Sequence, residues 1–313
     1  MIQLRRNLLG LLSLLASVSG LSAQTDARTL DGDVKLIIAN DLGRNGWDEQ
    51  KPVARLMGEV ADGIGPEAVL ALGDTHHYLG IQSVDDPLWM TDYELIYDHP
   101  ELQVEWCPVL GNHEYRGNTQ AVMDYSAVSR RWKMPARYYT KVFEDNGTSV
   151  RVVFVDTAPL IGKYREESDK YPDAGKQDVG RQLAWVDSVL SSADEDWVIV
   201  AGHHPMYADT DKDASERSDL QESLDPILKK HEVDMYVAGH IHNFQHFRKP
   251  GSDIDYIVNT SGSKARKVKK IDGTVFCAGV EGFSVLTADK NILRLSFVDK
   301  SGNVIHTVER RAR

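Results

Sequence analysis

The stretch Leu72-Gly73-Asp74-Thr75-His76-His77-Tyr78 decides the fold. It closes an apolar run over residues 68–72, which predicts a fully buried strand that ends at Gly73-Asp74. An aspartate at the carboxyl end of a strand stands where proteins with parallel sheets place their chemistry. By itself, a Gly-Asp pair after a strand is more often a turn or a helix cap. The prediction of a site therefore depends on whether other strands end in the same way.

Four more strand-like runs, at 34–39, 104–110, 197–201 and 235–238, end in residues of metal-binding types. Immediately beyond the five runs stand Asp41, Asp74, Asn112, His203, His240 and His242. Carboxylate, amide and imidazole groups suit zinc, iron and manganese. Six ligands are too many for one catalytic ion that must keep a water molecule, but they suit two ions that share a bridging carboxylate. The sequence therefore predicts a binuclear metal site at one edge of a sheet.

The remaining pattern is that of a single α/β domain over residues 24–313. Helical spacing of apolar residues predicts helices at 51–64, 88–97, 119–132, 179–191 and 220–231. Strands at 138–142 and 150–155 flank Asp145-Asn146-Gly147, a strong hairpin signal. Polar loops are expected at 158–178 and 206–220, and short strands at 256–258, 274–278, 283–286 and 292–298. No repeat or linker divides this part of the sequence.

The composition is globular and acidic. Hydrophobic residues make up 42% of the chain and charged residues 27%, with a formal net charge of -11. This charge argues against general binding to nucleic acid or anionic membrane. An anionic substrate would need local positive charge, which metal ions could supply. The two cysteines, Cys107 and Cys277, lie in strand-like apolar context, so we expect two separate buried thiols rather than a disulfide.

Residues 1–23 are predicted to be a signal peptide. Arg5-Arg6 forms a basic region, and residues 8–18 form an apolar region that is too short to span a bilayer. Small residues follow, and cleavage is expected after Ala23. An uncleaved anchor is the alternative. Export as a periplasmic or secreted protein without stable membrane insertion is the expectation.

The order of the strand-end motifs resembles that of the calcineurin-like metallophosphoesterases. These motifs read Asp-x-Gly, Gly-Asp, Gly-Asn-His-Glu, Gly-His and Gly-His-x-His. Asp41-Leu42-Gly43, which lacks the histidine most of that superfamily has, is similar to the purple acid phosphatases. The stretches at 130–139, 182–185 and 201–205 resemble the small, mammalian-type, tartrate-resistant-like branch. The resemblance implies a four-layer α/β/β/α sandwich with the metal ligands on loops at the carboxyl ends of strands.

The resemblance also implies roles for single residues. Asp41, Asp74 and His242 would hold the first metal ion, while Asn112, His203 and His240 would hold the second, with Asp74 bridging the two. The ions would be a pair drawn from iron, zinc and manganese. His113 would face the substrate and protonate the leaving group, and Glu114 would orient His113. A metal-bound hydroxide would attack a small-molecule phosphate monoester.

This chain departs from the family at two places. The family has a metal-binding tyrosinate three positions after the bridging aspartate, where this chain has His77, with Tyr78 one position further on. The register favours His77 as the ligand, and His76 is expected to be a supporting or surface residue. The branch also has a histidine in the loop that corresponds to 206–220, which has none here. His204 could substitute, or could be structural.

Three functions remain open at this point. The first is phosphomonoester hydrolysis at a binuclear metal site. The second is phosphodiester or nucleotide hydrolysis, and the third is metal binding without catalysis. A basic cluster at 264–270 reads as a solvated loop unless it lies near the metal ions, where it could attract phosphate.

Overall fold

The computed structural model describes residues 25–313, so the predicted signal peptide lies outside the described part. Two β-sheets lie face to face. The first sheet runs β13 (Val304–Arg311), β12 (Ile292–Asp299), β11 (Gly282–Ala288), β1 (Val34–Ala39), β2 (Ala68–Ala71) and β3 (Glu105–Pro108). The second runs β10 (Thr274–Ala278), β8 (Phe244–Phe247), β9 (Asp255–Val258), β7 (Met235–Ala238), β6 (Trp197–Ala201), β5 (Thr148–Phe154) and β4 (Tyr139–Asp145).

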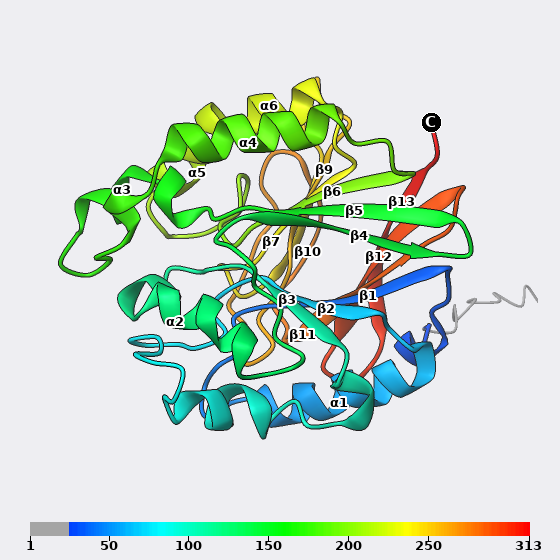
Figure 1. Ribbon diagram of the computed structural model, residues 1–313. Coiled ribbons are helices and arrows are strands. Elements are labelled where there is room, and N and C mark those ends of the chain that lie inside the picture. The colour runs from blue at the N-terminus through cyan, green and yellow to red at the C-terminus, as the bar shows by residue number, and fades with distance from the viewer. Residues whose placement is uncertain (1–24) are drawn as a thin grey trace, which may run out of the picture.

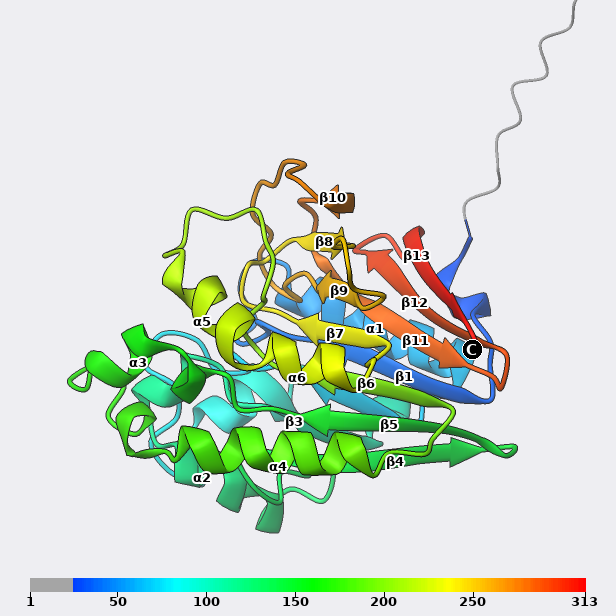
Figure 2. The ribbon, with the colours of Figure 1, turned by 90° about the horizontal axis from the view of Figure 1, so that it is seen from above.

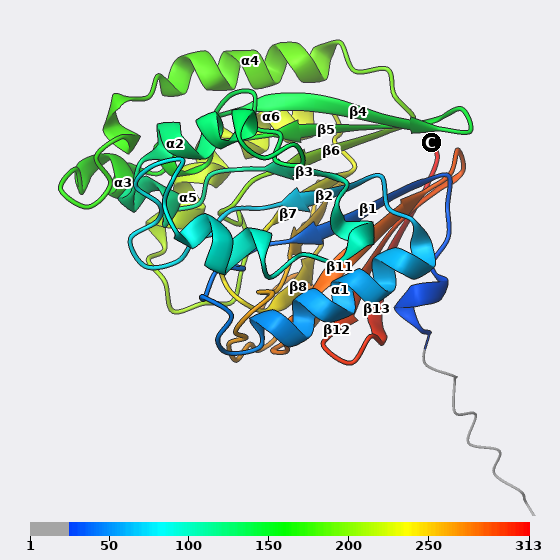
Figure 3. The same ribbon diagram turned by 60° about the horizontal axis from the view of Figure 1, so that its bottom comes forward.

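Helices cover the outer faces of both sheets. The α-helices are α1 (Gln50–Ile64), α2 (Thr119–Asp124), α3 (Gly162–Glu166), α4 (Val179–Ser191), α5 (Ser215–Ser223) and α6 (Asp225–Lys230). In Figure 1, α4, α5 and α6 lie along one side and α1 along the other, with the two sheets between them. Seen from above, α4 and α6 lie over the second sheet (Figure 2), and Figure 3 brings α1 forward over the first. This is the four-layer α/β/β/α sandwich that the resemblance implied.

The strands that carry the site are parallel and buried. β1, β2 and β3 pair in parallel, and so do β5, β6, β7 and β9. All residues of β2 and β7 are buried, because each strand is covered on both faces. Parallel pairing brings the carboxyl ends of neighbouring strands to one edge of each sheet. The sequence predicted a site at one edge of one sheet, whereas the structure has two sheets, each with such an edge.

The boundaries of several elements confirm the sequence predictions. α1 and α4 match the predicted helices within one residue at each end. The hairpin between β4 and β5 turns at Asn146 and Gly147, which both have positive φ, as a two-residue turn of this type requires. Cys107 and Cys277 are free thiols, as expected, although Cys277 is only half-buried on the edge strand β10.

Tertiary packing overrides local periodicity elsewhere. The predicted helix at 119–132 ends at Asp124, followed by one 3-10 turn, because Trp132 instead pairs with Trp106 beside β3. The predicted helix at 220–231 is two helices, α5 and α6, and Pro226 lies in the first turn of the second. The helix at 88–97 is a π-helix over Trp89–Glu94. Prediction missed α3 and β8.

Among the described residues, no helix is both long and apolar enough to cross a membrane.

Candidate metal centre

All six strand-end residues predicted as ligands meet between the carboxyl ends of the two sheets. Asp41, Asp74 and Asn112 follow β1, β2 and β3 of the first sheet, and the three histidines follow β6 and β7 of the second. Each of the six side chains belongs to a residue that is at most 4% exposed. Ligand atoms of Asp41, Asp74 and His203 lie within 4.8 Å of one another. The cluster is therefore a single buried group that both sheets contribute to.

Hydrogen bonds outside the cluster fix which nitrogen of each histidine points inward. His203 Nδ1 lies 2.8 Å from the carbonyl oxygen of Leu72, and His242 Nδ1 lies 2.8 Å from that of Lys264. Carbonyl oxygens only accept, so these Nδ1 atoms carry protons and the inward Nε2 atoms have lone pairs in the neutral rings. His240 is reversed, since its Nε2 lies 2.9 Å from a carboxylate oxygen of Glu216 and its Nδ1 is the nitrogen that points inward.

These inward lone pairs face other lone pairs at short range. His242 Nε2 lies 3.1 Å from Asp41 Oδ1, and His203 Nε2 lies 3.2 Å from Asp74 Oδ2. The inward nitrogens of His203 and His240 are 3.2 Å apart. Between unprotonated rings and carboxylates such contacts repel, so each of them requires either a proton on the histidine or a metal cation between the atoms. The short spacings are compatible with residues that would hold metal ions together, since imidazole and carboxylate are the ligands such ions take.

The backbone is strained where the ligands leave it. Asp41, Asp74, His240 and His242 all have positive φ, between 51° and 72°, which side chains other than glycine rarely adopt. Each such residue costs on the order of 1–3 kcal/mol and persists only where surrounding contacts impose it. One such contact is the 2.8 Å hydrogen bond from the His240 amide to Asp41 Oδ2. Strain of this kind is concentrated at functional sites.

Two motif glycines make room for the carboxylate and the imidazole. A Cβ on Gly111 would lie 2.3 Å from Asp74 Oδ1, and one on Gly73 would lie 2.6 Å from His203 Nδ1. Gly73 also has a φ of +82°. Any larger residue at either position would therefore displace a predicted ligand.

A family profile described as calcineurin-like phosphoesterase matches residues 34–244, which include all six residues. The chain belongs to the calcineurin-like phosphoesterases. Its relatives place it among the purple acid phosphatases. Purple acid phosphatase 3 of Arabidopsis thaliana is 32% identical over 96% of this chain and 84% of the relative. Tartrate-resistant acid phosphatase type 5 of Oryctolagus cuniculus is 33% identical over 67% of this chain and 65% of the relative.

Two solved structures share the fold. Purple acid phosphatase PPD1 from yellow lupin has a TM-score of 0.61 at 15% identity, covering 88% of this chain and 53% of that one. GAP50, described as the anchor in the inner membrane complex of Plasmodium, has a TM-score of 0.76 at 23% identity, covering 90% and 89%. At these identities the likeness concerns the fold alone, which does not determine activity.

In this calcineurin-like phosphoesterase, His77 and not Tyr78 points into the cluster. His77 is 4% exposed, and its inward atom lies within 4.8 Å of ligand atoms of Asp41 and His242. Neither ring nitrogen of His77 has a hydrogen-bond partner among residues 25–313. Tyr78 is 60% exposed, with its hydroxyl 3.5 Å from a nitrogen of Arg44. Burial lowers the pKa of His77 to about 3, so the ring is neutral and free to bind a metal ion.

Asn112, like His77, has a buried polar atom without a hydrogen-bond partner in the described part of the chain. That atom is its side-chain oxygen, Oδ1. Buried polar atoms are almost always satisfied, so the unpaired side chains of Asn112 and His77 are available to a ligand. An amide oxygen and an imidazole nitrogen are donors that a zinc, iron or manganese ion accepts. The residues present therefore fit a binuclear metal centre.

His113 stands at the mouth of the cluster. Its backbone N–H donates to Asp74 Oδ1 at 2.9 Å, and its Nδ1 lies 2.9 Å from the carbonyl oxygen of Tyr78. Its Nε2 lies 3.9 Å from Asp74 Oδ2, and the side chain is 17% exposed. The ring is thus held at Nδ1, while Nε2 is directed at the site and the side chain is partly open to solvent.

Glu114 does not orient His113 through a hydrogen bond of its side chain. Among residues 25–313, its carboxylate accepts only backbone N–H groups, those of Asp74 at 2.9 Å, Gly111 at 2.8 Å and His76 at 3.2 Å. It therefore joins the Asp74 loop to the Gly111 loop. Burial, followed by the neighbouring Asp74 carboxylate, raises the pKa of Glu114 to about 7.

The two remaining histidines next to predicted ligands are interior residues. His204 is fully buried, with its Nδ1 2.8 Å from the hydroxyl of Thr157 and its ring between those of Tyr164 and His240. The ligand atom of His204 lies within 4.8 Å of those of His203 and His240, and its Nε2 has no hydrogen-bond partner among residues 25–313. His76 is also fully buried, with its ring edge against Trp89, so it is not a surface residue.

Sequence reasoning missed Glu216, the carboxylate that holds His240. Glu216 is 3% exposed and lies on α5, in a segment whose polar sequence has no period that would indicate burial. Its other oxygen accepts from Lys163 at 2.7 Å and from the hydroxyl of Tyr164 at 3.1 Å. Outer carboxylates of this kind orient metal-binding histidines.

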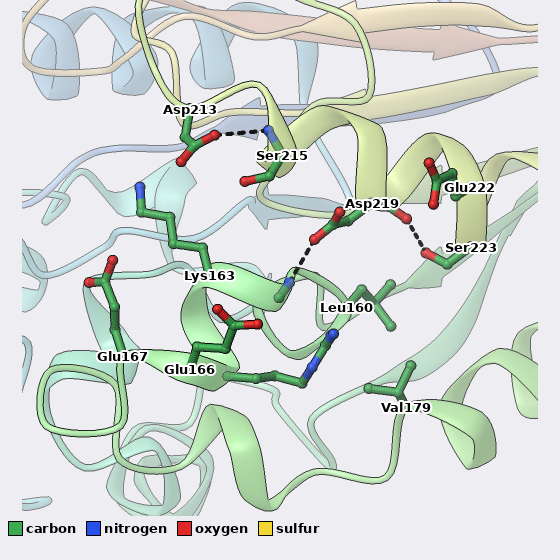
Figure 4. Close-up of a pocket in the computed structure, with 12 residues that line it drawn as sticks. Leu160, Lys163, Glu166, Glu167, Val179, Asp213, Ser215, Asp219, Glu222 and Ser223 are labelled. Carbon is green, nitrogen blue, oxygen red and sulfur yellow. Dashed lines mark hydrogen bonds between the residues drawn. The ribbon is translucent and has the colours of Figure 1, made fainter.

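Lys163 also lines a cleft of about 940 Å³ between α3 and α5 (Figure 4). Five of the twelve residues that line this cleft are acidic, Glu166, Asp213 and Asp219 among them, and two are basic. The predicted ligands do not line it. The cleft therefore lies behind Glu216 rather than at the metal centre.

Proposed function

We propose that this protein hydrolyses phosphate monoesters at a binuclear metal centre. The observation that carries the proposal is the cluster of inward ring nitrogens of His203, His240 and His242. Each of them lies 3.1–3.2 Å from another atom that could bind a metal ion. The purple acid phosphatases among its relatives support the reaction. Two bound ions would polarise the phosphoryl group and lower the pKa of water for an in-line displacement.

The spacings support a division of the ligands into two sets. Asp41, His77 and His242 would hold the first ion, and Asn112, His203 and His240 the second. Asp74 would bridge the two, since its Oδ2 faces His203 while ligand atoms of Asp74, His77 and His113 form a group of their own. The donors suit iron, zinc or manganese.

Residues of the chain would then supply the proton that the departing alcohol oxygen needs. His113 Nε2 is directed at the site, so it would bind the phosphoryl group and protonate the departing alcohol oxygen. The Tyr78 carbonyl oxygen holds His113 Nδ1 and thereby fixes the ring. Glu114 would keep Asp74 in place through the backbone of its loop.

Export belongs to the same proposal. Residues 1–23 would be removed as a signal peptide, leaving a periplasmic or secreted enzyme that begins at Gln24. Amino-terminal sequencing of the protein recovered outside the cytoplasm tests this step. A protein that still begins at Met1 would contradict it.

The activity is tested on purified residues 24–313 loaded with divalent zinc or manganese. We expect hydrolysis of an aryl phosphate and little hydrolysis of the matching aryl phosphodiester. Asp74→Asn is the matched variant, and it should lose nearly all activity and hold at most one ion, because one carboxylate joins the pair. Preference for the diester would favour a phosphodiesterase. Inactivity on both esters with two ions bound would favour a protein that binds metal without catalysis.

A further inference from the structure

Lys212 approaches the metal centre at His240. It lies in the loop between β6 and α5, within the stretch 206–220 in which the sequence has no histidine. Its Nζ is 3.5 Å from His240 Nδ1, the inward nitrogen that also lies 3.2 Å from His203 Nε2. The ammonium group is therefore directed at the centre and away from the outer surface.

The ammonium group lacks a carboxylate partner. Among residues 25–313, no carboxylate oxygen lies within 4.0 Å of Lys212 Nζ, although the side chain is half-buried. The neighbouring carboxylate, Glu216, is already occupied by Lys163, Tyr164 and His240. A desolvated ammonium without an anion is costly. The site is therefore built to receive negative charge beside Lys212.

The loop holds Lys212 in this position. The Lys212 N–H donates to the hydroxyl of Thr210 at 3.2 Å, and its carbonyl oxygen accepts from both terminal nitrogens of Arg217 at 3.5 and 3.4 Å. Arg217 lies on α5, the helix that also carries Glu216. The same helix thus orients His240 and anchors the backbone of Lys212.

We propose that Lys212 is a substrate-binding residue that donates to a non-bridging oxygen of the phosphoryl group. A protonated amine cannot bind a metal ion, and His240 Nδ1 has a single lone pair. Once that lone pair is used by an ion, the Lys212 protons are free for an anion. Lys212 would hold the phosphoryl group from the His203 and His240 side, and His113 from the His77 side. This inference rests on the proposed function for its substrate.

The direct test is calorimetric titration of the divalent-metal-loaded protein with inorganic phosphate. Lys212→Met removes the charge but keeps a similar apolar chain, and Lys212→Arg keeps the charge. A hydrogen bond to a charged group predicts roughly 10- to 100-fold weaker phosphate binding for Lys212→Met. Lys212→Arg should stay within a few-fold of wild type. Lys230→Met is the control, since Lys230 pairs with Asp187 on the exposed surface and precedes β7, away from its carboxyl end.

The binding result stands apart from the activity result. Phosphate affinity that Lys212→Met leaves unchanged would overturn the inference even if the wild-type enzyme hydrolyses monoesters. Loss of bound metal in Lys212→Met would overturn it too, because the role would then be structural. If the wild type binds phosphate through Lys212 but hydrolyses no monoester, the proposed function fails while the assignment of Lys212 holds.

Discussion

Glu216→Gln should weaken binding of the second metal ion and leave the first largely unaffected. Glu216 Oε2 accepts from His240 Nε2 at 2.9 Å, and this contact both sets the tautomer and increases the basicity of Nδ1. Glutamine keeps the shape and an acceptor but loses the charge. Outer partners of metal-binding histidines are worth about 10- to 100-fold in metal affinity, which is about 1.4–2.7 kcal/mol. The first ion should be spared because the described contacts of Glu216 include none to Asp41, His77 or His242.

The assay is titration of metal-depleted protein with zinc in competition with a chromophoric chelator, which resolves two binding steps. The matched control is Glu222→Gln, an exposed glutamate on the same helix α5, which should match wild type. Equal weakening of both steps would mean that Glu216 stabilises the fold around the site rather than His240. Unchanged affinity for both ions would refute the assignment of Nδ1 as the inward ligand atom.

Three further predictions concern single residues. His113→Ala should keep both ions but lower kcat by roughly 10²–10⁴, with the larger loss on esters that have poor leaving groups. Steady-state kinetics together with metal analysis measures both effects, and loss of metal would instead make His113 a ligand. When the protein is loaded with iron and zinc, its visible spectrum should show no purple colour and its activity should peak nearer neutral pH than that of an acid phosphatase, because neutral His77 replaces a tyrosinate. An intense tyrosinate-to-iron absorption band that Tyr78→Phe abolishes would contradict this. Burial raises the pKa of Asp156 to about 7 from its ordinary value of 3.8, so between these values the folded state holds a proton that the unfolded state has released. This contribution to stability is lost as pH rises from about 4 through 7. Asp156→Asn should therefore lose less stability than wild type between pH 5 and pH 8 in urea unfolding, and identical slopes would show that Asp156 is already ionised.

The sequence revealed the metal centre because its ligands follow buried parallel strands. Runs such as those before Asp74 and His203 are apolar over their whole length, so both their burial and their ends can be read from composition. What the pattern could not show is that the ligands come from two sheets. Sheet pairing depends on contacts between distant segments, and local periodicity does not report them.

Residues in the loops were harder to predict. Glu216 and Lys212 lie in a polar segment that reads as solvent-exposed, and only the packing of α5 against the His240 loop places them at the centre. The Glu114 carboxylate accepts from backbone N–H groups rather than from the His113 ring, so the orienting role that the resemblance implied for Glu114 stays a prediction. The choice between His77 and Tyr78 depended on side-chain direction within one loop, which adjacent positions cannot settle.

The most direct test of the central claim is the metal content of the purified chain, measured by elemental analysis after natural loading in the cell. Two ions per chain are expected in the wild type, and Asp74→Asn should retain one or none, because Asp74 would be shared between the ions. A wild-type protein that holds at most one ion, or an Asp74→Asn variant that keeps both, would contradict the binuclear centre.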